Sequence, residues 1–565
     1  MTEQQNSQTL TTESPFVRIV SIGGTGMFGM NCLLLESGQT RIVIDAGVMF
    51  PADDDLGVDL ITPDFTILEE NPPTALLVTH AHEDHIGAIP YLIMALVQHG
   101  HKFKLPIYAS DFTIALIRRR LEEHDLCGHV AFYTVRPKST MQFGDLHVEC
   151  IDVCHSIPGS LAFAFDTPAG KIVHSGDWRI DNTPMSGAKT NLGRFEALGD
   201  EGVRLFLSDS TNVEVDNTGI TSELDVFNDI QTCIKQAKGR VFVTLFASNI
   251  GRLQSILYAA ANTGRRLVIC GRSMHSNMTI ARELDYLKYP PNLEILSEDD
   301  MPKDDDNLVV IVSGSQGEKT ASLFKISQGD HPRIKLRPTD TLLYSARQIP
   351  GNERRITSII NGFYRQGASL IDRPDLTLHS SGHGNQRELE LLIDLIAPQL
   401  FVPIHGDHRR LSLHEQLAQR ATNGSDNAGM ITEILDEGQC LILYKDHHEI
   451  RDGFMPSRRY VVGKCLNGID PTITKEKKNL GHQGILTISG VLNSNDELVG
   501  DLRIHNIGIC VNNGWFDEIE PEILRTIATS AHHGDMEEII RHKAAKLIKA
   551  SIGRFPTVVV DFFRI

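Results

Sequence analysis

The most constraining feature of the sequence is a short segment in which four potential metal ligands follow an apolar strand within six residues. The segment Leu76–Thr79 leads directly into His80, His82, Asp84 and His85. Imidazole and carboxylate ligands in this mixture suit Zn²⁺ or Mn²⁺ better than Mg²⁺ or Ca²⁺. A histidine-rich surface turn is the alternative, but such a turn does not require an HxHxDH order directly after a strand. The segment therefore predicts a two-metal site at the end of a buried strand.

Three later segments offer the ligands that a two-metal site still needs, which number about three. His155 follows a strand-like segment and precedes a Ser-x-Pro turn, and Asp177 follows another strand and a glycine. His405 repeats the order of strand, histidine and glycine far downstream. Taken singly, each of these residues is more often a polar residue at the edge of a core than a ligand. Together they complete the ligand set.

Length and composition place the chain among multidomain globular proteins, since 565 residues with 41% hydrophobic content allow about three domains. The longest uninterrupted apolar run, Tyr91–Val97, falls far short of the roughly 20 residues that cross a bilayer. Residues 1–14 are polar, so we expect a disordered tail and no signal peptide. The nine cysteines are scattered and lack a CxxC pair, which predicts reduced thiols. These features predict a cytoplasmic protein with no membrane partner.

The net charge of −18 argues at first against a nucleic-acid partner, because phosphate binding normally leaves a basic footprint. Local clusters of arginine can override the total, although a run of charge is usually only a solvated face. The clusters are Arg118–Arg120, then Arg347 with Arg354, Arg355 and Arg365, and finally Arg409–Arg410. Charge alone therefore leaves a polyanionic partner open.

The pattern of apolar residues divides the chain into three structured parts. The first part is predicted to hold strands at Val17–Ile22, Cys32–Leu35, Arg41–Ile44 and Ala75–Thr79 and helices at Ile86–His99 and Asp111–His124. From about Thr221 helices and strands alternate, as is typical of an α/β domain, at Asp225–Gln236, Arg240–Leu245, Ile250–Thr263, Arg266–Cys270, Ser276–Tyr286 and Leu308–Val312. After a charged segment at Lys445–Arg459, the last part is predicted to hold strands at Ile485–Val491, Ile507–Val511 and Thr557–Phe562 and a helix through Ile539–Ile548.

The segment Gly24–Gly29 matches the GxGxxG pattern of dinucleotide-binding folds, with Asp45 at the distance of a ribose-binding acid. No helix is predicted at Gly29, because Met30–Leu35 reads as a second strand. A glycine hairpin between two strands is therefore favoured over a pyrophosphate site.

Several long motifs resemble those of bacterial ribonuclease J, in the β-CASP group of the metallo-β-lactamase superfamily. The ligands occur in the order of the metallo-β-lactamase fold, and the resemblance covers nearly the whole chain. The matching segments are Gly57–Asp64, His80–Tyr91, Phe246–Ile250, Gly314–Glu318, Ile349–Glu353 and His379–His383. One departure is Met27–Phe28, followed by Met30 and Asn31, where the family usually carries a Glu-Ile pair in the glycine loop.

The resemblance implies an α/β fold in three domains: a metallo-β-lactamase αββα sandwich, an inserted α/β β-CASP domain and a small C-terminal α/β domain. The implied boundaries are 15–220 and 365–450 for the lactamase domain, 221–364 for the β-CASP domain, 451–460 for a linker and 461–565 for the C-terminal domain. The C-terminal domain supports dimer formation in the family, so we expect homodimers or homotetramers. Its His532–His533 pair is isolated and more typical of surface residues than of ligands.

The resemblance also implies a division of the ligands between two ions. The first ion is expected at His80, His82 and His155, the second at Asp84, His85 and His405, with Asp177 bridging them. Two ions, Zn²⁺ with Mn²⁺ as the alternative, lower the pKa of bound water and so supply hydroxide at neutral pH. Asp84 is expected to orient that hydroxide for attack on a phosphodiester, and each histidine is expected to need an acceptor that fixes its tautomer.

The stretch His379–His383 matches the family's phosphate cradle, and its residue types agree with that role. Ser380 and Ser381 offer hydroxyls, Gly382 lets the backbone approach an anion, and His383 can donate a proton or a charged hydrogen bond. A Ser/Gly turn with a purely structural role is the alternative reading.

Asp209 matches the acidic motif of the family and is expected to hold His383. His383 would then protonate or stabilise the departing 3′ oxygen of the RNA, as general acids do. Further contacts with RNA phosphates are expected from residues in matched loops, namely Ser315, Ser345, Arg347 and Arg252.

The activity implied by the resemblance is metal-dependent 5′ to 3′ exonucleolysis of 5′-monophosphorylated single-stranded RNA, with some endonucleolytic cutting. Such an enzyme acts in rRNA and mRNA maturation and decay, and an RNA-degradation complex is an expected partner. The alternatives are a small-ester or thioester hydrolase, a strictly endonucleolytic or DNA-directed β-CASP nuclease, and a catalytically silent RNA-binding subunit. An ester hydrolase has no need of the inserted domain, and the retained ligands and His383 argue against a silent subunit.

Overall fold

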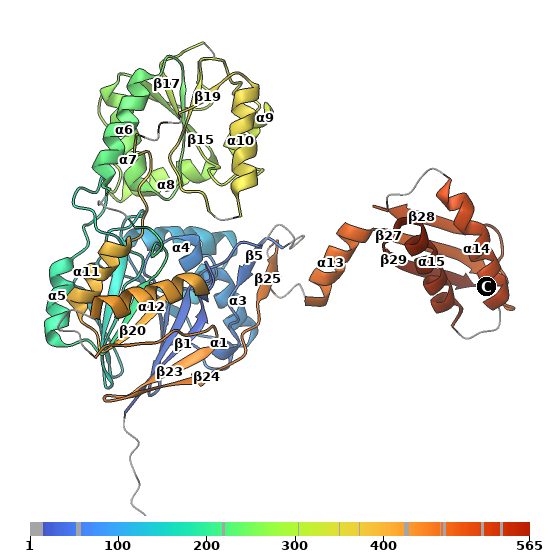
Figure 1. The fold of residues 1–565 in the computed structure, drawn as a ribbon, viewed down its shortest axis with the longest axis horizontal. Coiled ribbons are helices and arrows are strands. Elements are labelled where there is room, and N and C mark those ends of the chain that lie inside the picture. Colours follow the sequence, from blue (N-terminus) through green and yellow to red (C-terminus); the bar gives the residue numbers. More distant parts are fainter. Residues whose placement is uncertain are drawn as a thin grey trace, which may run out of the picture. The chain divides into compact units, whose positions relative to one another are not determined.

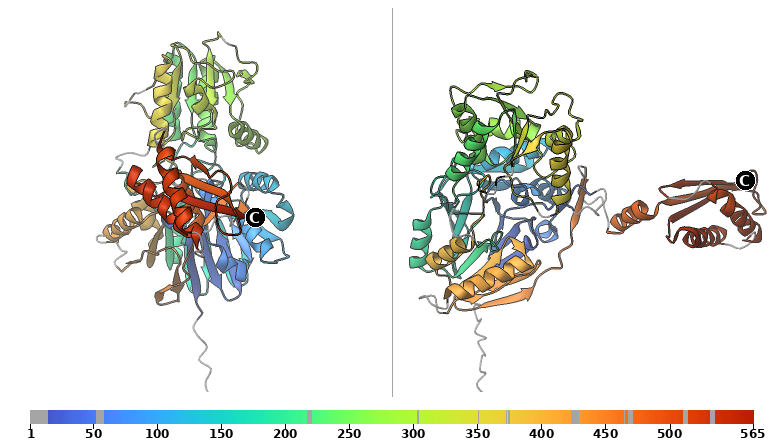
Figure 2. Two further views of the ribbon diagram at one scale, coloured as in Figure 1. Left: turned by 90° about the vertical axis from the view of Figure 1, so that its right-hand side faces the viewer. Right: turned by 45° about the horizontal axis from the view of Figure 1, so that its top comes forward.

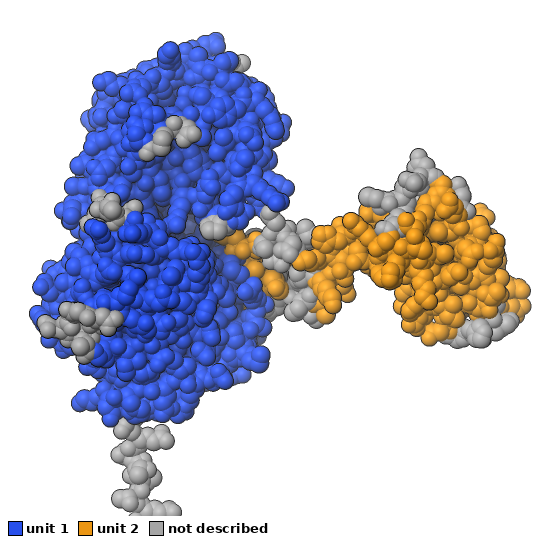
Figure 3. Space-filling model, viewed as in Figure 1, with its two compact units in different colours: residues 1–49, 62–458 blue, residues 50–61, 459–565 orange. Residues whose placement is uncertain are grey.

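The fold is that of a computed structural model, in which the described part of the chain forms two compact units. The described residues are 15–51, 58–216, 221–302, 304–349, 351–371, 373, 375–422, 429–463, 465–466, 471–509, 514–530 and 535–565. Unit 1 contains residues up to 49 and 62–458, and unit 2 contains residues 50–61 and 459–565 (Figure 3). The predicted tail at 1–14 and the His532–His533 pair lie outside the described residues.

The larger part of unit 1 is built from two β-sheets that pack face to face. The first sheet has the strand order β24 (His448–Asp452), β23 (Gln439–Leu443), β1 (Val17–Gly23), β3 (Cys32–Ser37), β4 (Thr40–Ile44), β6 (Ala75–Leu77), β7 (Leu105–Ala109) and β8 (Val130–Thr134). The second has the order β22 (Ile431–Thr432), β20 (Leu400–Ile404), β13 (Leu205–Asp209), β12 (Gly170–His174), β11 (Leu161–Thr167), β10 (Leu146–Asp152) and β9 (Thr140–Phe143).

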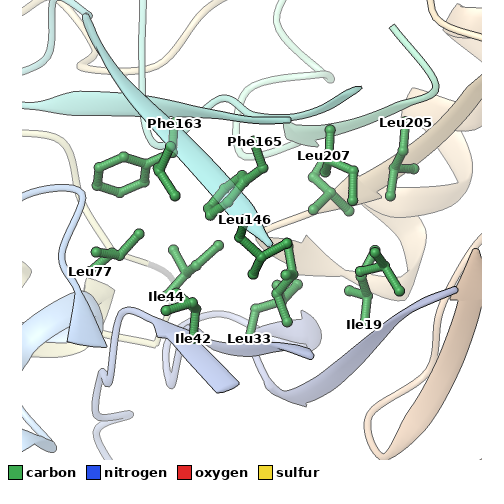
Figure 4. Close-up of a cluster of buried hydrophobic side chains, with 14 of the residues drawn as sticks. Ile19, Leu33, Ile42, Ile44, Leu77, Leu146, Phe163, Phe165, Leu205 and Leu207 are labelled. Carbon is green, nitrogen blue, oxygen red and sulfur yellow. The ribbon is translucent and has the colours of Figure 1, made fainter. Parts of the chain in front are cut away.

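Alternation of apolar residues along these strands gives each sheet one face that must be buried. In Figure 4 side chains such as Ile19, Ile44 and Leu77 from the first sheet point toward Phe163 and Leu207 from the second. All five side chains are 1% exposed or less, so the space between the sheets is a closed apolar core. This core fixes the positions of the strand ends that carry the candidate ligands.

Helices cover the outer faces of the two sheets (Figures 1 and 2). Those that follow strands of the first sheet are α1 (Thr66–Glu70), α2 (Glu83–Ile86), α3 (Ile89–Gln98) and α4 (Asp111–Glu123). Those that pack on the second sheet are α5 (Leu192–Glu201), α11 (Gln386–Ile396) and α12 (His408–Thr422). The order of helix, sheet, sheet and helix confirms the predicted αββα sandwich.

A second α/β domain interrupts the sandwich between β13 and β20, which are paired in parallel. Its strands are all parallel, in the order β16 (Ile295–Leu296), β15 (Arg266–Cys270), β17 (Leu308–Val312), β14 (Val241–Thr244), β18 (Thr341–Tyr344) and β19 (Ser369–Leu370). Its helices are α6 (Glu223–Gln236), α7 (Ile250–Asn262), α8 (Arg272–Glu283), α9 (Ser322–Gln328) and α10 (Glu353–Arg365) (Figure 1). A parallel sheet needs such crossover helices, which explains the alternation seen in the sequence.

Unit 2 contains a three-stranded sheet and two helices that bury a core of their own. The sheet has the order β28 (Arg503–Ile507), β27 (Ile485–Leu492) and β29 (Thr557–Arg564), and the helices are α14 (Trp515–Ser530) and α15 (Met536–Ile552). The unit also holds α13 (Pro471–Gln483) and a small sheet of β26 (Cys465–Leu466), β25 (Arg459–Val462) and β5 (Leu60–Thr62).

Two sequence predictions about elements were wrong. The helix expected at Ile86–His99 begins only at Ile89, as α3, because Pro90 at its start favours a new helix over the continuation of α2, which ends at Ile86. The strand β28 ends at Ile507, where a strand was expected to begin and run to Val511, because Gly508 takes a positive φ of 73° and turns the chain; residues 510 and 511 lie outside the described residues.

Two other expectations agree with the structure. The glycine segment joins β1 and β3 as neighbouring antiparallel strands, as a hairpin requires. The cysteines whose side chains are described, seven of the nine, are all free thiols. In the described part of the chain, no helix combines the length and the hydropathy that crossing a membrane would require.

Candidate metal centre

The predicted ligands follow strands whose carboxyl ends lie at one edge of the sandwich. In the second sheet, β12, β13 and β20 are parallel neighbours that lead into Asp177, Asp209 and His405. The strand β10 runs in the same direction and leads into His155. The strand β6 of the first sheet leads into His80 and the helix α2. The topology therefore brings residues from distant parts of the sequence to one place.

Three histidines form the first group of candidate ligands. Nδ1 of His82 lies 3.1 Å from Nε2 of His80 and 3.1 Å from Nε2 of His155. Ligand atoms arranged tetrahedrally at 2.0–2.1 Å around a zinc ion lie ~3.3 Å from one another. The spacing of the three nitrogens therefore fits one ion bound between them.

The hydrogen bonds around these rings favour the tautomers that a metal needs. The Thr79 hydroxyl donates to Oδ2 of Asp45 at 2.7 Å, so it can only accept from Nδ1 of His80 at 3.0 Å. Nδ1 of His155 lies 2.6 Å from the carbonyl oxygen of Gly382 and must donate to it. In both rings the proton is held on Nδ1 and the lone pair of Nε2 is free for a cation.

The second group consists of His85, His405 and Asp84. Nε2 of His85 lies 3.3 Å from Nε2 of His405, and Oδ2 of Asp84 lies 3.6 Å and 3.4 Å from these two nitrogens. Nδ1 of His85 lies 2.7 Å from Oδ2 of Asp45, which again directs Nε2 toward the candidate site. These residues form a second set of convergent ligands.

Asp177 lies between the two groups and is 3% exposed. Its Oδ2 is 3.5 Å from Nε2 of His80 in the first group and 3.2 Å from Nε2 of His405 in the second. It is also 3.3 Å from Nε2 of His85. A carboxylate oxygen at the centre of two ligand sets is the arrangement that a bridging ligand requires.

Burial and charge act differently on the two groups of histidines. Burial lowers the pKa of His80 and of His155 well below the ordinary value, so these rings are neutral, as metal ligands must be. Burial also lowers the pKa of His85, but the charges of Asp177, Asp84 and Asp45 outweigh burial and raise it to about 10. The buried carboxylates therefore call for positive charge, and divalent cations would supply it.

The glycine loop that precedes β3 contacts this centre, which the sequence motif alone did not reveal. Nδ2 of Asn31 donates to the backbone oxygen of Asp84 at 3.1 Å and lies 3.1 Å from Nε2 of His85. Within the same loop, β2 (Thr25–Gly26) pairs with β21 (Gly406–Asp407), directly after His405. The Phe28 ring, at the position where the chain departs from the family pattern, lies under the guanidinium of Arg410 at 4.5 Å.

His383 and Asp209 form a hydrogen-bonded pair beside the ligands. Nδ1 of His383 lies 2.8 Å from Oδ2 of Asp209 and 3.9 Å from Oδ2 of Asp177. The other carboxylate oxygen of Asp209 accepts from the backbone amide and the hydroxyl of Thr211, which fixes the carboxylate in place. Because Asp209 occupies Nδ1, Nε2 is the nitrogen that His383 can present to a substrate.

The loop at 379–383 lies against both the ligands and the inserted domain. The carbonyl oxygen of Gly382 accepts from His155, and the hydroxyl of Ser381 accepts from the amide of His383. The hydroxyl of Ser380 donates to Glu223 at 2.6 Å, so it is already bonded within the protein. Burial lowers the pKa of His379 to about 3, so that ring is neutral.

The other residues predicted to contact RNA differ in how accessible they are to a substrate. Arg347 is exposed and donates to Asn212, and it remains accessible to a phosphate. Ser315 is buried, and its carbonyl accepts from the Tyr344 hydroxyl. Ser345 is 1% exposed and its hydroxyl accepts from Arg252 and donates to a backbone oxygen.

Arg252 does not have the exposed position expected of a phosphate contact. It is fully buried and pairs with Glu223 through two hydrogen bonds, of 2.8 Å and 3.0 Å. The same guanidinium reaches the hydroxyls of Ser345 and Ser380. The expectation was wrong because the first turn of helix α7 is buried against the rest of the protein. Arg252 is one of the buried residues of that turn.

A separate cluster of Cys270, Glu298 and His331 in the inserted domain does not fit a metal. Nδ1 of His331 accepts the backbone amide of Ile334 at 3.1 Å, so the neutral ring carries its proton on Nε2. Nε2 is the atom that faces Glu298 at 3.4 Å and Cys270 at 3.8 Å. That proton is explained by a hydrogen bond to Glu298 and leaves no lone pair for a cation.

Family comparisons agree with this architecture. Residues 40–197 match the beta-lactamase superfamily domain, and residues 238–363 match the domain described as ribonuclease J, beta-CASP. Residues 377–428, which include the 379–383 loop and His405, match the Zn-dependent metallo-hydrolase RNA specificity domain.

Curated relatives are similar over most of the chain. Ribonuclease J 1 of Streptococcus pyogenes is 35% identical over 485 residues, which cover 86% of this chain and 84% of the relative. Ribonuclease J of Thermus thermophilus is 33% identical over 564 residues, which cover 96% and 94% of the two chains. A solved structure of a protein of unknown function from Enterococcus faecalis V583 has 16% identity and a TM-score of 0.51, covers 76% of this chain and 100% of its own, and supports the fold alone.

Proposed function

Because the chain belongs to the ribonuclease J family and is therefore a metal-dependent ribonuclease, we propose that it degrades 5′-monophosphorylated single-stranded RNA in the 5′ to 3′ direction. The observation that carries the proposal is the position of the His383–Asp209 pair. It stands 3.9 Å from the central carboxylate oxygen of Asp177 and next to the 379–383 loop. A phosphodiester can thus meet the metal ligands and a proton donor at the same time.

The proposed ligands divide as the geometry groups them. One ion is held by His80, His82 and His155, the other by Asp84, His85 and His405, with Asp177 shared. The donor set of imidazoles and carboxylates suits Zn²⁺, with Mn²⁺ as the alternative. When bound, the two ions supply a nucleophile at neutral pH and neutralise charge that develops on the phosphorus.

The protein side chains have the remaining tasks. Asp84, whose side chain is one-third exposed, faces the substrate side and can accept a proton from the attacking water. His383 carries a proton on Nε2 toward the leaving 3′ oxygen, while Asp209 stabilises the charged ring. Thr79 and Asp45 hold the ligand rings in their orientation.

The 379–383 loop is proposed to bind the RNA phosphates near the cleavage point. Gly382 has no side chain between its backbone and His155, and Ser381 and His383 supply polar groups on the same turn. Arg347 would add a positive charge from the inserted domain. Ser345 and Ser380 would support the loops that hold these groups, since their hydroxyls already have partners within the protein, and the backbone carbonyl of Ser315 accepts from Tyr344 in the same way.

The direction of degradation is tested with one RNA labelled at either end and prepared with a 5′ monophosphate or a 5′ triphosphate. The proposal predicts release of labelled mononucleotide from the 5′ end and faster decay of the monophosphate form. Discrete internal fragments alone would indicate a strictly endonucleolytic enzyme, and equal decay of a DNA strand would indicate a DNA-directed one. No decay after loading with Zn²⁺ or Mn²⁺ would indicate a silent RNA-binding subunit.

Further proposals concern the setting of the enzyme. We propose that it is a cytoplasmic homodimer or homotetramer that acts in rRNA and mRNA maturation and decay, in association with an RNA-degradation complex. The outer face of the unit 2 sheet supports self-association, because Phe563, Val559 and Ile507 on it are 65%, 43% and 71% exposed. We propose that new domains or segments begin at residues 221, 365, 451 and 461.

A further inference from the structure

We propose that the groove between helices α4 and α8 is a second binding site for the RNA backbone, remote from the bond that is cleaved. This inference rests on the proposed function, because it assigns a longer path to the same single-stranded substrate. Helix α4 belongs to the lactamase sandwich and α8 to the inserted domain, so a strand in the groove contacts both.

The groove has the size of a binding site and carries three arginines. Its volume is about 640 Å³, within the range of ligand sites in proteins. Its charged residues are Arg118, Arg119 and Glu122 from α4 and Arg272 from α8, and the rest of the lining is Ala115, His275, Ser276, Thr279 and Ile280. The backbone of each helix is internally bonded, so a ligand in the groove would be contacted by side chains, of which the arginines reach furthest.

The charge in the groove is not explained by pairing within the protein. Among the described residues, no ion pair involves Arg118, Arg119 or Arg272, and Glu122 is the one acidic residue of the lining. Arg119 donates to the hydroxyl of Ser276 across the groove, and Arg118 lies 4.7 Å over the ring of Phe132. In a chain with a net charge of −18, three arginines left together without carboxylate partners call for an anionic ligand.

The groove is connected to the metal centre through both of its helices. Arg120, the next residue of α4, pairs with Glu83, which directly precedes the ligand Asp84. At the other end of α4, Asp111 accepts from the hydroxyl of Tyr286, which follows α8. Eight residues of helix separate Asp111 from Arg119, a distance of about 12 Å at 1.5 Å per residue.

Tyr286 connects the Asp111 end of the groove with the region of the candidate ligands. Its backbone oxygen accepts from the hydroxyl of Ser186 at 2.9 Å. Ser186 lines the same small cavity as His155 and Ser381. A strand that lies in the groove can therefore continue to the 379–383 loop without leaving the surface shared by the two domains.

Arginine side chains favour a sugar-phosphate backbone as the occupant. A guanidinium binds phosphate oxygens through two parallel hydrogen bonds, and several at successive positions match a ligand with a repeated charge. The lining contains no phenylalanine, tyrosine or tryptophan, so base stacking is not the main basis of recognition. We therefore expect contacts that depend on salt and on RNA length, and not on base sequence.

The test compares Arg118→Gln/Arg272→Gln with the unchanged protein on 5′-phosphorylated RNAs of increasing length. These two arginines are exposed, and Arg119 is left in place because it also joins the two helices. For a long homopolymer, the slope of log affinity against log salt should fall by about 0.7 for each phosphate that is no longer bound, hence by about 1.4. Turnover of a phosphorylated dinucleotide, which is too short to reach the groove, should be unchanged.

Two further proteins serve as controls. Arg118→Lys/Arg272→Lys keeps the charge and should retain most of the salt dependence. Arg420→Gln removes an exposed arginine from the end of α12, on the opposite helical layer, and should leave the slope unchanged. Together they separate a local contact from an effect of net charge.

An unchanged slope in the double glutamine variant would overturn the proposal, as would an equal fall in Arg420→Gln. Loss of dinucleotide turnover would also overturn it, because the arginines would then act on catalysis. If inorganic phosphate competed as well as long RNA did, the groove would be a simple anion site. Failure of the unchanged protein to degrade any RNA would count against the proposed function instead.

Discussion

At the level of single residues, the candidate centre depends on which ring nitrogen of each histidine carries a proton. Asp45 and Thr79 form hydrogen bonds that fix the ring orientations of His80 and His85. Neither Asp45 nor Thr79 belongs to the HxHxDH ligand set. Asp45 has a positive φ of 60°, which is uncommon for a residue other than glycine. The backbone strain is offset by two hydrogen bonds from Thr79 to the carboxylate.

The first prediction concerns His383. Replacing it by alanine should lower turnover by about 100- to 10,000-fold, the usual contribution of a general acid, because Nε2 is no longer available. Metal content should stay at two ions per chain, since His383 is outside both ligand groups. Metal analysis and single-turnover cleavage check this. Loss of an ion together with activity would assign His383 to the metal site.

The second prediction concerns the pH dependence of the metal-free protein. His85 has a folded pKa of about 10 against an ordinary value of 6.5, so folding takes up a proton. Its contribution to the free energy of unfolding is complete below pH 6.5 and is lost as the pH rises toward 10. His82 acts in the opposite direction, because burial lowers its pKa to about 4. Its contribution is lost as the pH falls from 6.5 toward 4.

The melting temperature of the metal-free protein should therefore be highest near neutral pH and fall on both sides. With Zn²⁺ bound, the fall on the alkaline side should disappear, because the cations replace the protons near the carboxylates. Differential scanning calorimetry of both forms measures this. An alkaline decline of equal size in both forms would contradict the assignment of His85 as a ligand.

The sequence identified the candidate ligands that the structure brings together, but it did not identify the residues that hold them in place. The ligands follow strands in a recognisable order, so residue type and spacing are sufficient to find them. Asn31 and Asp45 reach the centre only because β4 lies between β3 and β6 in the folded sheet. Arg252 was misplaced for the same reason: an arginine near a matched loop gives no sign in the sequence that Glu223 will bury it.

At the level of elements, the 379–383 loop is the point where the ligands and the inserted domain meet. A Cβ atom added at Gly382 would lie 2.7 Å from Cε1 and 2.8 Å from Nδ1 of His155. At Gly384, two residues later, an added Cβ would make ordinary contacts, the nearest at 3.4 Å. Gly384 is therefore a suitable control position for a substitution at Gly382.

The third prediction follows from these two glycines. Gly382→Ala should displace His155 and lower both the occupancy of the first ion and the rate of RNA cleavage by at least tenfold, about 1.4 kcal/mol. Gly384→Ala should leave both nearly unchanged. Metal titration followed by a cleavage assay distinguishes the two variants. Full metal binding in Gly382→Ala would show that the loop can yield without moving His155.

The fourth prediction concerns the buried pair of Arg252 and Glu223. It connects α6 and α7 with the loops that carry Ser345 and Ser380. Arg252→Met should lower the free energy of unfolding by about 3–5 kcal/mol, because Glu223 keeps a buried charge without a partner. Adding Glu223→Gln should restore part of the loss.

The control for this variant is Arg373→Met. Arg373 pairs with Asp375 with equally short distances, but the side chains are 46% and 59% exposed. Its loss should have little effect on the free energy of unfolding, because solvent screens an exposed pair. Chemical denaturation of the variants measures the difference. Equal costs for the two arginines would show that burial does not govern the Arg252 pair.

At the level of the whole molecule, the fifth prediction concerns self-association through unit 2. Phe563→Asp on the outer face of β29 should shift the protein toward monomers, because a charge replaces an aromatic side chain that is 65% exposed. Phe562, the next residue, is 6% exposed and belongs to the core, so it is unsuitable for this test. Analytical ultracentrifugation measures the mass. An unchanged mass would place the self-association surface elsewhere.

The sequence also predicted the order of domains, because alternation of helices and strands changes character near residue 221. It could not show that β13 and β20, separated by the whole inserted domain, are parallel neighbours. Such pairing is decided by the burial of Leu207 and Val402 between the sheets, and local periodicity contains no information about it.

The interruption of the second sheet has a consequence for the newly made chain as it leaves the ribosome. Six of the seven proposed ligands are synthesised by residue 177, but His405 follows only after the inserted domain is complete. The last proposed ligand is therefore synthesised only after the inserted domain is complete. A nascent chain lies beside the messenger RNA that encodes it, and for most of its synthesis its candidate metal centre lacks His405.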